Sequence, residues 1–184
     1  HPKQELVPEL GGVALPRSLD LVRQPAFRIR GIQPHTLHPI EWLEPLAEPG
    51  AENLADAKRL IDWLTKTGQN LVQWPLLEYE QFPTYAAHAG AIADYAHVRG
   101  ARVGAVVQMF GASALQNNYV LVHDENAWQP ELEAGIDELM TVSWDSVALA
   151  AGEFVGNDPA EVISWLNHAT QYFADNYPNV EVSV

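Results

Sequence analysis

Strand-like and helix-like segments alternate along this chain, and this alternation limits the fold more than any other feature. Five apolar runs have the length and composition of buried strands, and amphipathic segments with helical spacing lie between them. The runs expected to be strands are residues 27–33, 70–77, 102–110, 139–145 and 180–184. Strands separated by helices pair in parallel through right-handed crossovers, so the sequence predicts an α/β fold of parallel βα repeats.

The ends of the expected helices carry typical capping signals. Asn53 is a suitable N-cap for the first helix, and Gly68 is placed to end it. Asp158 caps the last helix, and Glu161 completes a capping box there. Two further helices are expected to begin near residues 84 and 130, so a helix fills each gap between the expected strands.

The connections between these elements differ in length in a regular way. Helix-to-strand links are short, whereas the strand-to-helix links span residues 34–52, 77–83, 111–129 and 146–157. Such long loops emerge at the carboxyl ends of parallel strands, where barrels and open α/β sheets bind ligands. A TIM-type (β/α)8 barrel needs roughly 250 residues. The 184 residues are therefore expected to supply about five of its strands and to be incomplete at the C-terminus, with a complete open sheet as the alternative.

Residues 1–26 differ in composition from the rest of the chain. Four prolines and the pair Gly11-Gly12 interrupt any regular element in this segment. We expect residues 1–26 to be a linker or lead-in from an N-terminal domain. Residues 27–184 are then expected to form the partial barrel domain.

The charge balance excludes several classes of partner. The chain has 24 acidic and 10 basic residues, a formal net charge of −14, which disfavours binding to nucleic acid or anionic membranes. Cysteine is absent, which rules out thiol catalysis. The sequence contains no glycine-rich nucleotide-binding motif, zinc-protease motif or serine-hydrolase elbow, so no cofactor is expected. No apolar run approaches the ~18 residues of a membrane span, and a secreted or periplasmic location is compatible with the sequence.

Residues with binding chemistry gather in the expected strand-to-helix loops. Tryptophan faces stack on sugar rings, and amide groups both donate and accept hydrogen bonds, as hydroxyl-rich ligands require. The expected substrate-binding residues are His35, His38, Trp74, Glu78, Gln108, Asn117 and Trp144. The plainer alternatives are a core position for Trp74 and ordinary loop polarity for the others. No metal is assigned to the histidine pair, because the sequence shows no obvious third ligand.

Two acidic residues flank the end of the fourth expected strand. Asp145 is the last residue of that strand, and Glu153 follows in a loop of mostly apolar residues. Burial among apolar side chains raises the pKa of a carboxyl group, as a general acid acting near neutral pH requires. We therefore expect Glu153 to be the catalytic proton donor and Asp145 to orient it or adjust its pKa. The plainer alternatives are an exposed loop charge for Glu153 and a hydrogen-bond acceptor that holds a loop for Asp145.

The segment QPAFRIRGIQPHTLHPIEWL, residues 24–43, resembles the entry into the barrel of β-N-acetylhexosaminidases and α-glucuronidase-like glycosidases. In these families a lead-in from an N-terminal domain ends in an Arg-Gly on the first strand, matched here by Arg30-Gly31. A catalytic carboxylate follows the fourth strand in these families, and WDSVALAAGEF, residues 144–154, lies at that position here. The resemblance implies a glycosidase barrel, a carbohydrate substrate and catalysis by carboxylates.

The chain departs from the hexosaminidase pattern in two places. QPHTLH, residues 33–38, stands where an acidic residue usually follows the glycine of the first strand. Asp145 and Glu153 are eight positions apart, whereas a tight Asp-Glu pair is usual after the fourth strand. These differences argue against substrate-assisted cleavage of N-acetyl sugars. They leave open a barrel of this type that has lost catalysis.

The leading prediction is a glycoside hydrolase-type barrel that acts on a glycosidic bond by carboxylate acid/base catalysis. Its expected partners are a carbohydrate substrate and the remainder of its own barrel. Two alternatives stay open: a non-catalytic carbohydrate-binding or scaffold barrel, and a metal-dependent hydrolase that uses His35 and His38. The first alternative needs only aromatic and amide groups, whereas the second needs both histidines to converge with a carboxylate.

Overall fold

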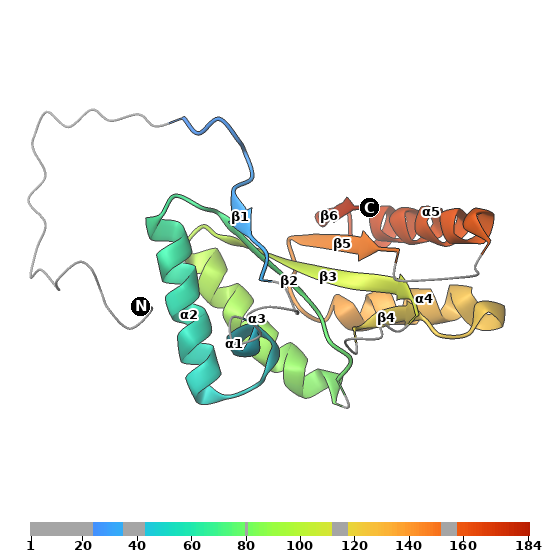
Figure 1. Cartoon of the computed structure of the whole chain (residues 1–184), viewed down its shortest axis with the longest axis horizontal. Coiled ribbons are helices and arrows are strands. Elements are labelled where there is room, and N and C mark those ends of the chain that lie inside the picture. The colour runs from blue at the N-terminus through green and yellow to red at the C-terminus, as the bar shows by residue number, and fades with distance from the viewer. Residues whose placement is uncertain (1–23, 35–42, 80, 112–117, 152–157) are drawn as a thin grey trace, which may run out of the picture.

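The computed structural model describes residues 24–34, 43–79, 81–111, 118–151 and 158–184 (Figure 1). The strands are β1 (Gly31–Ile32), β2 (Leu71–Pro75), β3 (Arg102–Phe110), β4 (Val120–Val122), β5 (Ser146–Ala150) and β6 (Glu181–Ser183). The α-helices are α1 (Glu44–Ala47), α2 (Ala51–Lys66), α3 (Phe82–Val98), α4 (Trp128–Leu139) and α5 (Pro159–Asn176). A short 3₁₀ helix, η2 (Glu125–Ala127), precedes α4.

The six strands form one sheet in which every pair of neighbours is parallel. Their order is β1-β2-β3-β5-β6, and β4 pairs with β3 beyond the point where β2 ends. β1 and β6 are the edges of the described sheet, which does not close on itself. The predicted α/β fold of parallel βα repeats is confirmed, and the arrangement is consistent with part of a TIM-type barrel.

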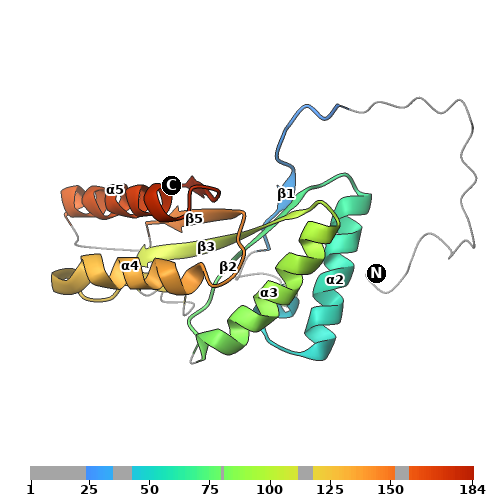
Figure 2. The same cartoon turned by 180° about the vertical axis from the view of Figure 1, so that it is seen from behind.

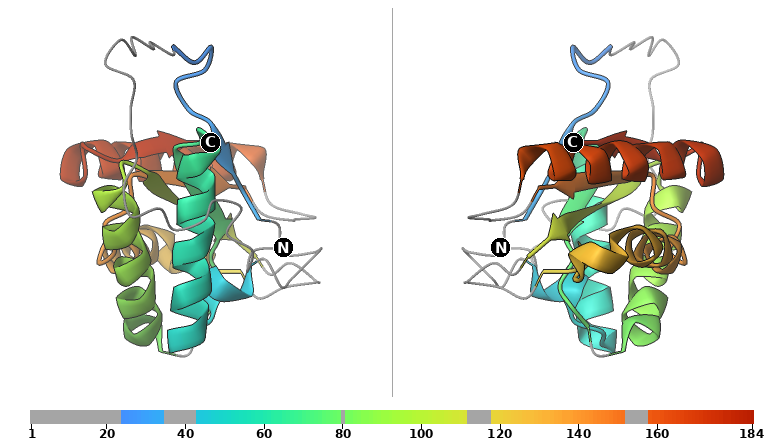
Figure 3. Two further views of the ribbon diagram at one scale, coloured as in Figure 1. Left: turned by 90° about the vertical axis from the view of Figure 1, so that its left-hand side faces the viewer. Right: turned by 90° about the vertical axis from the view of Figure 1, so that its right-hand side faces the viewer.

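One face of this sheet is covered by the long helices. Figures 2 and 3 show α2 beside α3, and α4 beside α5, packed against the strands. The buried strand side chains that contribute to the single core are Val72, Trp74, Val103, Ala105, Val107, Met109, Val147 and Leu149. The helices contribute residues such as Ile61, Tyr85, Ile92, Ile136, Trp165 and Phe173. Each large apolar side chain that is fully buried in this way stabilises the fold by about 1.5–3 kcal/mol.

The other face of the sheet is only half-buried. Gly104 of β3 lies between Gln73 of β2 and Ser146 of β5, close enough that an added Cβ would collide with Ser146 Oγ. The side chains that share this face by alternation and register are Leu71, Gln73, Pro75, Val106, Gln108, Ser146, Ala148 and Ala150. We call this surface the open face, because its residues keep part of their area exposed.

The prediction of a strand at residues 139–145 is wrong. Helix α4 continues to Leu139, and the chain then turns, with Trp144 N donating to Val142 O at 2.8 Å, before β5 begins at Ser146. Val142 and Trp144 are 1% and 3% exposed. Their apolar side chains fill the core beneath a helix-to-strand link, so burial rather than strand pairing accounts for their composition.

The first expected strand is shorter than predicted, since only Gly31 and Ile32 of residues 27–33 pair with β2. β4 was not expected, because a three-residue strand gives little signal within the long link at residues 111–129. Residues 1–23 lie outside the described part, so the lead-in at residues 1–26 stays a prediction. Over the described ranges, the structure contains no helix with the length and hydropathy needed to span a membrane.

Candidate functional site

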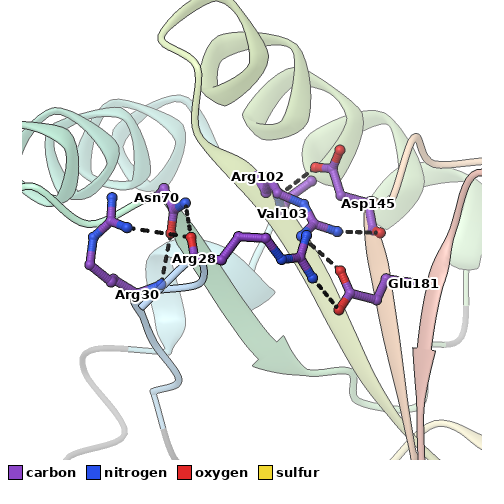
Figure 4. Close-up of polar contacts among 7 residues, drawn as sticks. All are labelled: Arg28, Arg30, Asn70, Arg102, Val103, Asp145 and Glu181. Atoms are coloured by element: carbon purple, nitrogen blue, oxygen red, sulfur yellow. Dashed lines mark hydrogen bonds and ion pairs between the residues drawn. The ribbon is translucent and has the colours of Figure 1, made fainter. Parts of the chain in front are cut away.

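The amino end of the open face is occupied by ion pairs (Figure 4). Arg102 Nη1 donates to Glu181 Oε2 at 2.9 Å, and Arg28 Nη2 donates to Glu181 Oε1 at 3.1 Å. Arg102 Nη2 also donates to the backbone oxygen of Asp145 at 3.0 Å. The segment before β1 is thereby joined to β3 and β6. Because this end is filled by paired charges, the carboxyl end of the face is the better place for a ligand.

The Glu181 cluster makes stability depend on pH. The hydrogen bond from Arg102 lowers the pKa of Glu181, and the charge of Arg28 acts in the same direction. Because the native pKa is lowered, ionised Glu181 stabilises the folded state fully at pH values above the unfolded carboxyl pKa of about 4.3. This stabilisation is lost as the pH falls through the native pKa. We expect Glu181→Gln to unfold at lower urea concentration than the parent at neutral pH, and the difference in urea midpoint to shrink as the pH falls below about 4.3.

The matched control for Glu181 is Asp94→Asn, since Asp94 is exposed on α3 and away from this cluster. It should change the urea midpoint little at either pH. If the urea midpoints of Glu181→Gln and the parent differed by the same amount in acid as at neutral pH, the assigned ion pairs would be contradicted.

Gln108 provides a polar group at the carboxyl end of the open face. It belongs to β3 and pairs with Ala150 of β5 and Val120 of β4. Its Oε1 atom is buried and has no hydrogen-bond partner among the described residues. An unpaired buried acceptor costs about 1–3 kcal/mol. Because the oxygen has almost no accessible area in this structure, a ligand hydroxyl would reach it only if the amide turned toward the open face. Gln108 thus lies at a strand end, as predicted, and its contact with substrate stays a prediction.

Two polar residues of the open face were not predicted from the sequence. Gln73 Nε2 donates to the backbone oxygen of Ala105 at 3.4 Å, and Ser146 Oγ is buried without a partner among the described residues. They flank Gly104 in one row across the sheet. Alternation along residues 71–75 could have identified Gln73, because Val72 and Trp74 mark the opposite face. The sequence pattern does not single out Ser146, because the apolar run at residues 139–145 ends one position before it.

Trp74 and Trp144 do not line a binding site, and their prediction as sugar-stacking residues is wrong. Trp74 is 0% exposed, and its Nε1 donates to Tyr85 Oη at 3.0 Å. Trp144 is 3% exposed, and its Nε1 donates to the backbone oxygen of Leu139 at 3.0 Å. The two rings meet edge to face with centroids 4.9 Å apart. Both side chains therefore belong to the core, the plainer interpretation of Trp74.

Asp145 lies at the amino end of β5, so its expected place at the carboxyl end of a strand is wrong. Its Oδ2 accepts a hydrogen bond from Val103 N at 2.7 Å (Figure 4). The same atom accepts a hydrogen bond from His97 Nε2 at 3.0 Å. These contacts hold the α4–β5 link against β3 and α3. The error follows from the misplaced strand, because the carboxyl end of β5 is Ala150.

Glu78 follows β2 and is exposed. It lines a cavity of about 710 Å³ between α3 and α4, together with residues of both helices and of β4. The structure therefore places Glu78 near the carboxyl edge of the sheet but on the helix side. Its role as a substrate-binding residue of the same site as Gln108 stays a prediction.

Four predicted site residues, His35, His38, Asn117 and Glu153, lie outside the described residues. They fall in the links that follow β1, β3 and β5. Within the described ranges, no group of three or more His, Asp or Glu side chains is arranged to hold a metal ion. The catalytic role of Glu153 therefore stays a prediction.

Comparisons with known proteins give a likeness of structure only. No protein-family model matches the sequence, and no curated protein matches it. A crystal structure of β-arabinopyranosidase superposes with a TM-score of 0.50 at 13% identity, over 90% of this chain and 24% of that one. The α-N-acetylgalactosaminidase of Bifidobacterium bifidum gives a TM-score of 0.49 at 11% identity, over 84% of this chain and 33% of that one.

The chain spans about a quarter to a third of the length of these two structures. At such low identity the likeness concerns the fold and not the chemistry. The open parallel sheet with helices on one face is thus an α/β fold similar to part of the β-arabinopyranosidase structure.

Proposed function

We propose that this chain is part of a glycoside hydrolase-type barrel that binds carbohydrate at the carboxyl end of its open face. The observation that carries the proposal is Gln108, whose buried Oε1 has no partner among the described residues. Ala150, its partner across the sheet, has a single methyl group as its side chain. An amide in a half-buried, small-residue surface suits a sugar hydroxyl, which can both donate and accept.

Glu153 is the proposed proton donor. It comes three positions after Ala150, the last residue of β5, and so belongs to the link at the carboxyl edge of the sheet. Catalytic residues of barrel enzymes occupy this edge. Asp145 is not its partner in this proposal, since its carboxylate accepts hydrogen bonds from Val103 N and His97 at the opposite edge.

A non-catalytic carbohydrate-binding barrel is the second candidate. The position of Asp145 favours this candidate. Asp145 is the carboxylate that was expected to act beside Glu153, but its hydrogen bond from Val103 N stabilises the fold at the amino end of β5. Binding through Gln108 needs no carboxylate pair. The metal-dependent alternative depends on His35 and His38, which lie outside the described residues, and it stays a prediction.

We further propose that additional strands of the same barrel pair with the sheet edges. β1 and β6 are short, each has one neighbour among the described strands, and strand edges present unpaired backbone groups. Phe27, four residues before β1, is 74% exposed. A strand that covered the β1 edge would bury this side chain.

The experiment for the proposed function measures binding and hydrolysis on the unmodified protein. A panel of oligosaccharides is titrated by calorimetry, and aryl glycosides are incubated with the protein while phenol release is recorded. Release that Glu153→Gln abolishes identifies the enzyme, whereas binding without release identifies the carbohydrate-binding barrel. Neither binding nor release across the panel would contradict the proposed carbohydrate site.

A further inference from the structure

Asn118 is a buried residue with an unused side-chain amide. It lies just before β4, is 9% exposed, and forms a backbone bridge with Leu77, which follows β2. Its amide makes no hydrogen bond with any described residue, whereas the other buried polar side chain of the described part, His88, bonds Pro45 O at 3.0 Å. The amide atoms of Asn118 are not among the fully enclosed atoms that lack a partner, so a ligand can reach them.

The alternation of side chains along this segment assigns Asn118 to the open face. Tyr119 Oη donates to the backbone oxygen of Gly135 at 3.0 Å, and Leu121 lies against Gly135, so both side chains point toward α4. Successive residues of an extended segment point to opposite faces of a sheet. Asn118 and Val120 therefore take the face that the helices leave uncovered.

Gln108 lies within reach of the same ligand. Gln108 N donates to Tyr119 O at 3.0 Å, and Gln108 pairs with Val120. Asn118 comes two positions before Val120, which makes it the diagonal neighbour of Gln108 on this face, at roughly 7–8 Å between Cα atoms. Side chains of this length bridge such a separation, so the two amides can contact adjacent groups of one molecule.

The surroundings of Asn118 suit a neutral, hydroxyl-rich ligand. Among the described residues of β2, β3 and β5, the open face carries no charged side chain beyond its ion-paired amino end. A primary amide presents an acceptor oxygen and a donor nitrogen side by side in one plane. Two neighbouring hydroxyl groups of a sugar ring match this pair, because one donates to the oxygen while the other accepts from the nitrogen.

We propose that Asn118 is a specificity-determining residue whose amide holds two adjacent ring hydroxyl groups of the sugar, beside Gln108. This inference rests on the proposed function and adds to it the class of ligand, a neutral sugar with a free vicinal diol. Gln108 joins the contact when its amide turns toward the open face. A sugar that lacks either hydroxyl leaves one side of the Asn118 amide unpaired and binds more weakly.

The test removes the amide and the hydroxyl groups in turn. The probes are galacto-, gluco-, manno- and arabino-trisaccharides and, for the tightest binder, its monodeoxy analogues, titrated by calorimetry into the full chain. At least two of the monodeoxy analogues should bind the parent about tenfold more weakly than the trisaccharide does. Asn118→Leu should bind the trisaccharide about tenfold more weakly and should no longer distinguish it from these analogues.

Two controls separate contact with the sugar from a structural role. Asn176→Leu makes the same change at an exposed residue at the end of α5 and should leave the affinity within about twofold. Asn118→Leu should melt at or above the temperature of the parent, because its amide has no partner to lose among the described residues.

The outcomes distinguish this inference from the proposed function. If Gln108→Leu weakened binding and Asn118→Leu did not, the carbohydrate site would stand and the role of Asn118 would be overturned. An unchanged preference for the trisaccharide over its monodeoxy analogues in Asn118→Leu, or a lower melting temperature of this variant, would also overturn that role. No binding of any trisaccharide to the parent would contradict the proposed function and the inference with it.

Discussion

Replacing Trp74 by alanine is expected to lower the free energy of unfolding by about 3–5 kcal/mol. The indole is fully buried, packs edge to face on Trp144, and donates to Tyr85 Oη. Truncation would remove this packing, open a cavity beneath α3, and leave a buried hydroxyl without its donor. Urea unfolding followed by circular dichroism measures the effect, because the secondary structure reports the folded fraction at each urea concentration.

The matched control is Trp63→Ala, since Trp63 lies on α2 and is 48% exposed. Trp63→Ala should lower the free energy of unfolding far less than Trp74→Ala, because much of the Trp63 side chain is already in water in the folded state. If Trp74→Ala unfolded at the same urea concentration as the parent and weakened only carbohydrate binding, Trp74 would be a ligand contact and its assignment to the core would be wrong.

Glu153→Gln is expected to lower the rate of aryl glycoside hydrolysis by about 10²–10⁴-fold, if the chain is the proposed enzyme. Glutamine keeps the shape of the side chain but cannot deliver a proton to the leaving group. Substrates with acidic phenol leaving groups need little protonation and should lose least. The measurement is the rate for a series of aryl glycosides that differ in the pKa of the phenol.

Glu161→Gln is the control for this series, because Glu161 has the same side chain and lies in the first turn of α5. It should leave the rates unchanged. Full activity of Glu153→Gln on poor leaving groups would show that another residue donates the proton.

The βα order was predictable from the sequence because it depends on long, regular signals. Residues 102–110 are an almost entirely apolar run that coincides with β3, and Asp158 caps α5 by accepting from Ala160 N at 2.9 Å. Gly68 ends α2 with a φ of 80°, a conformation that residues with a side chain rarely adopt. Asn53 was expected to begin this helix, but α2 begins at Ala51 and Asn53 Nδ2 donates to Glu48 O at 3.0 Å.

The candidate site was harder to predict because it depends on which face each side chain takes. Val142 and Trp144 are residue types typical of strands, yet they are buried in the link before β5. Asp145 therefore lies at the amino end of β5 and not at the carboxyl edge, where catalysis is expected. Neighbouring strand residues point to opposite faces of the sheet, so Trp74 lies in the core whereas Gln73 lies on the open face. The position of Gln108 near a strand end is predictable because the apolar run at residues 102–110 coincides with β3.

Calorimetric titration of Gln108→Leu with the tightest-binding oligosaccharide of the panel tests the central claim most directly. Leucine keeps most of the side-chain volume and removes the buried amide oxygen, so binding should weaken by about tenfold. Gln73→Leu is the matched control, since Gln73 is the same residue type on the same face but two rows nearer the ion-paired amino end. It should change the affinity by less than about twofold. Unchanged affinity in Gln108→Leu, or equal losses in both variants, would contradict a carbohydrate site at the carboxyl end of the open face.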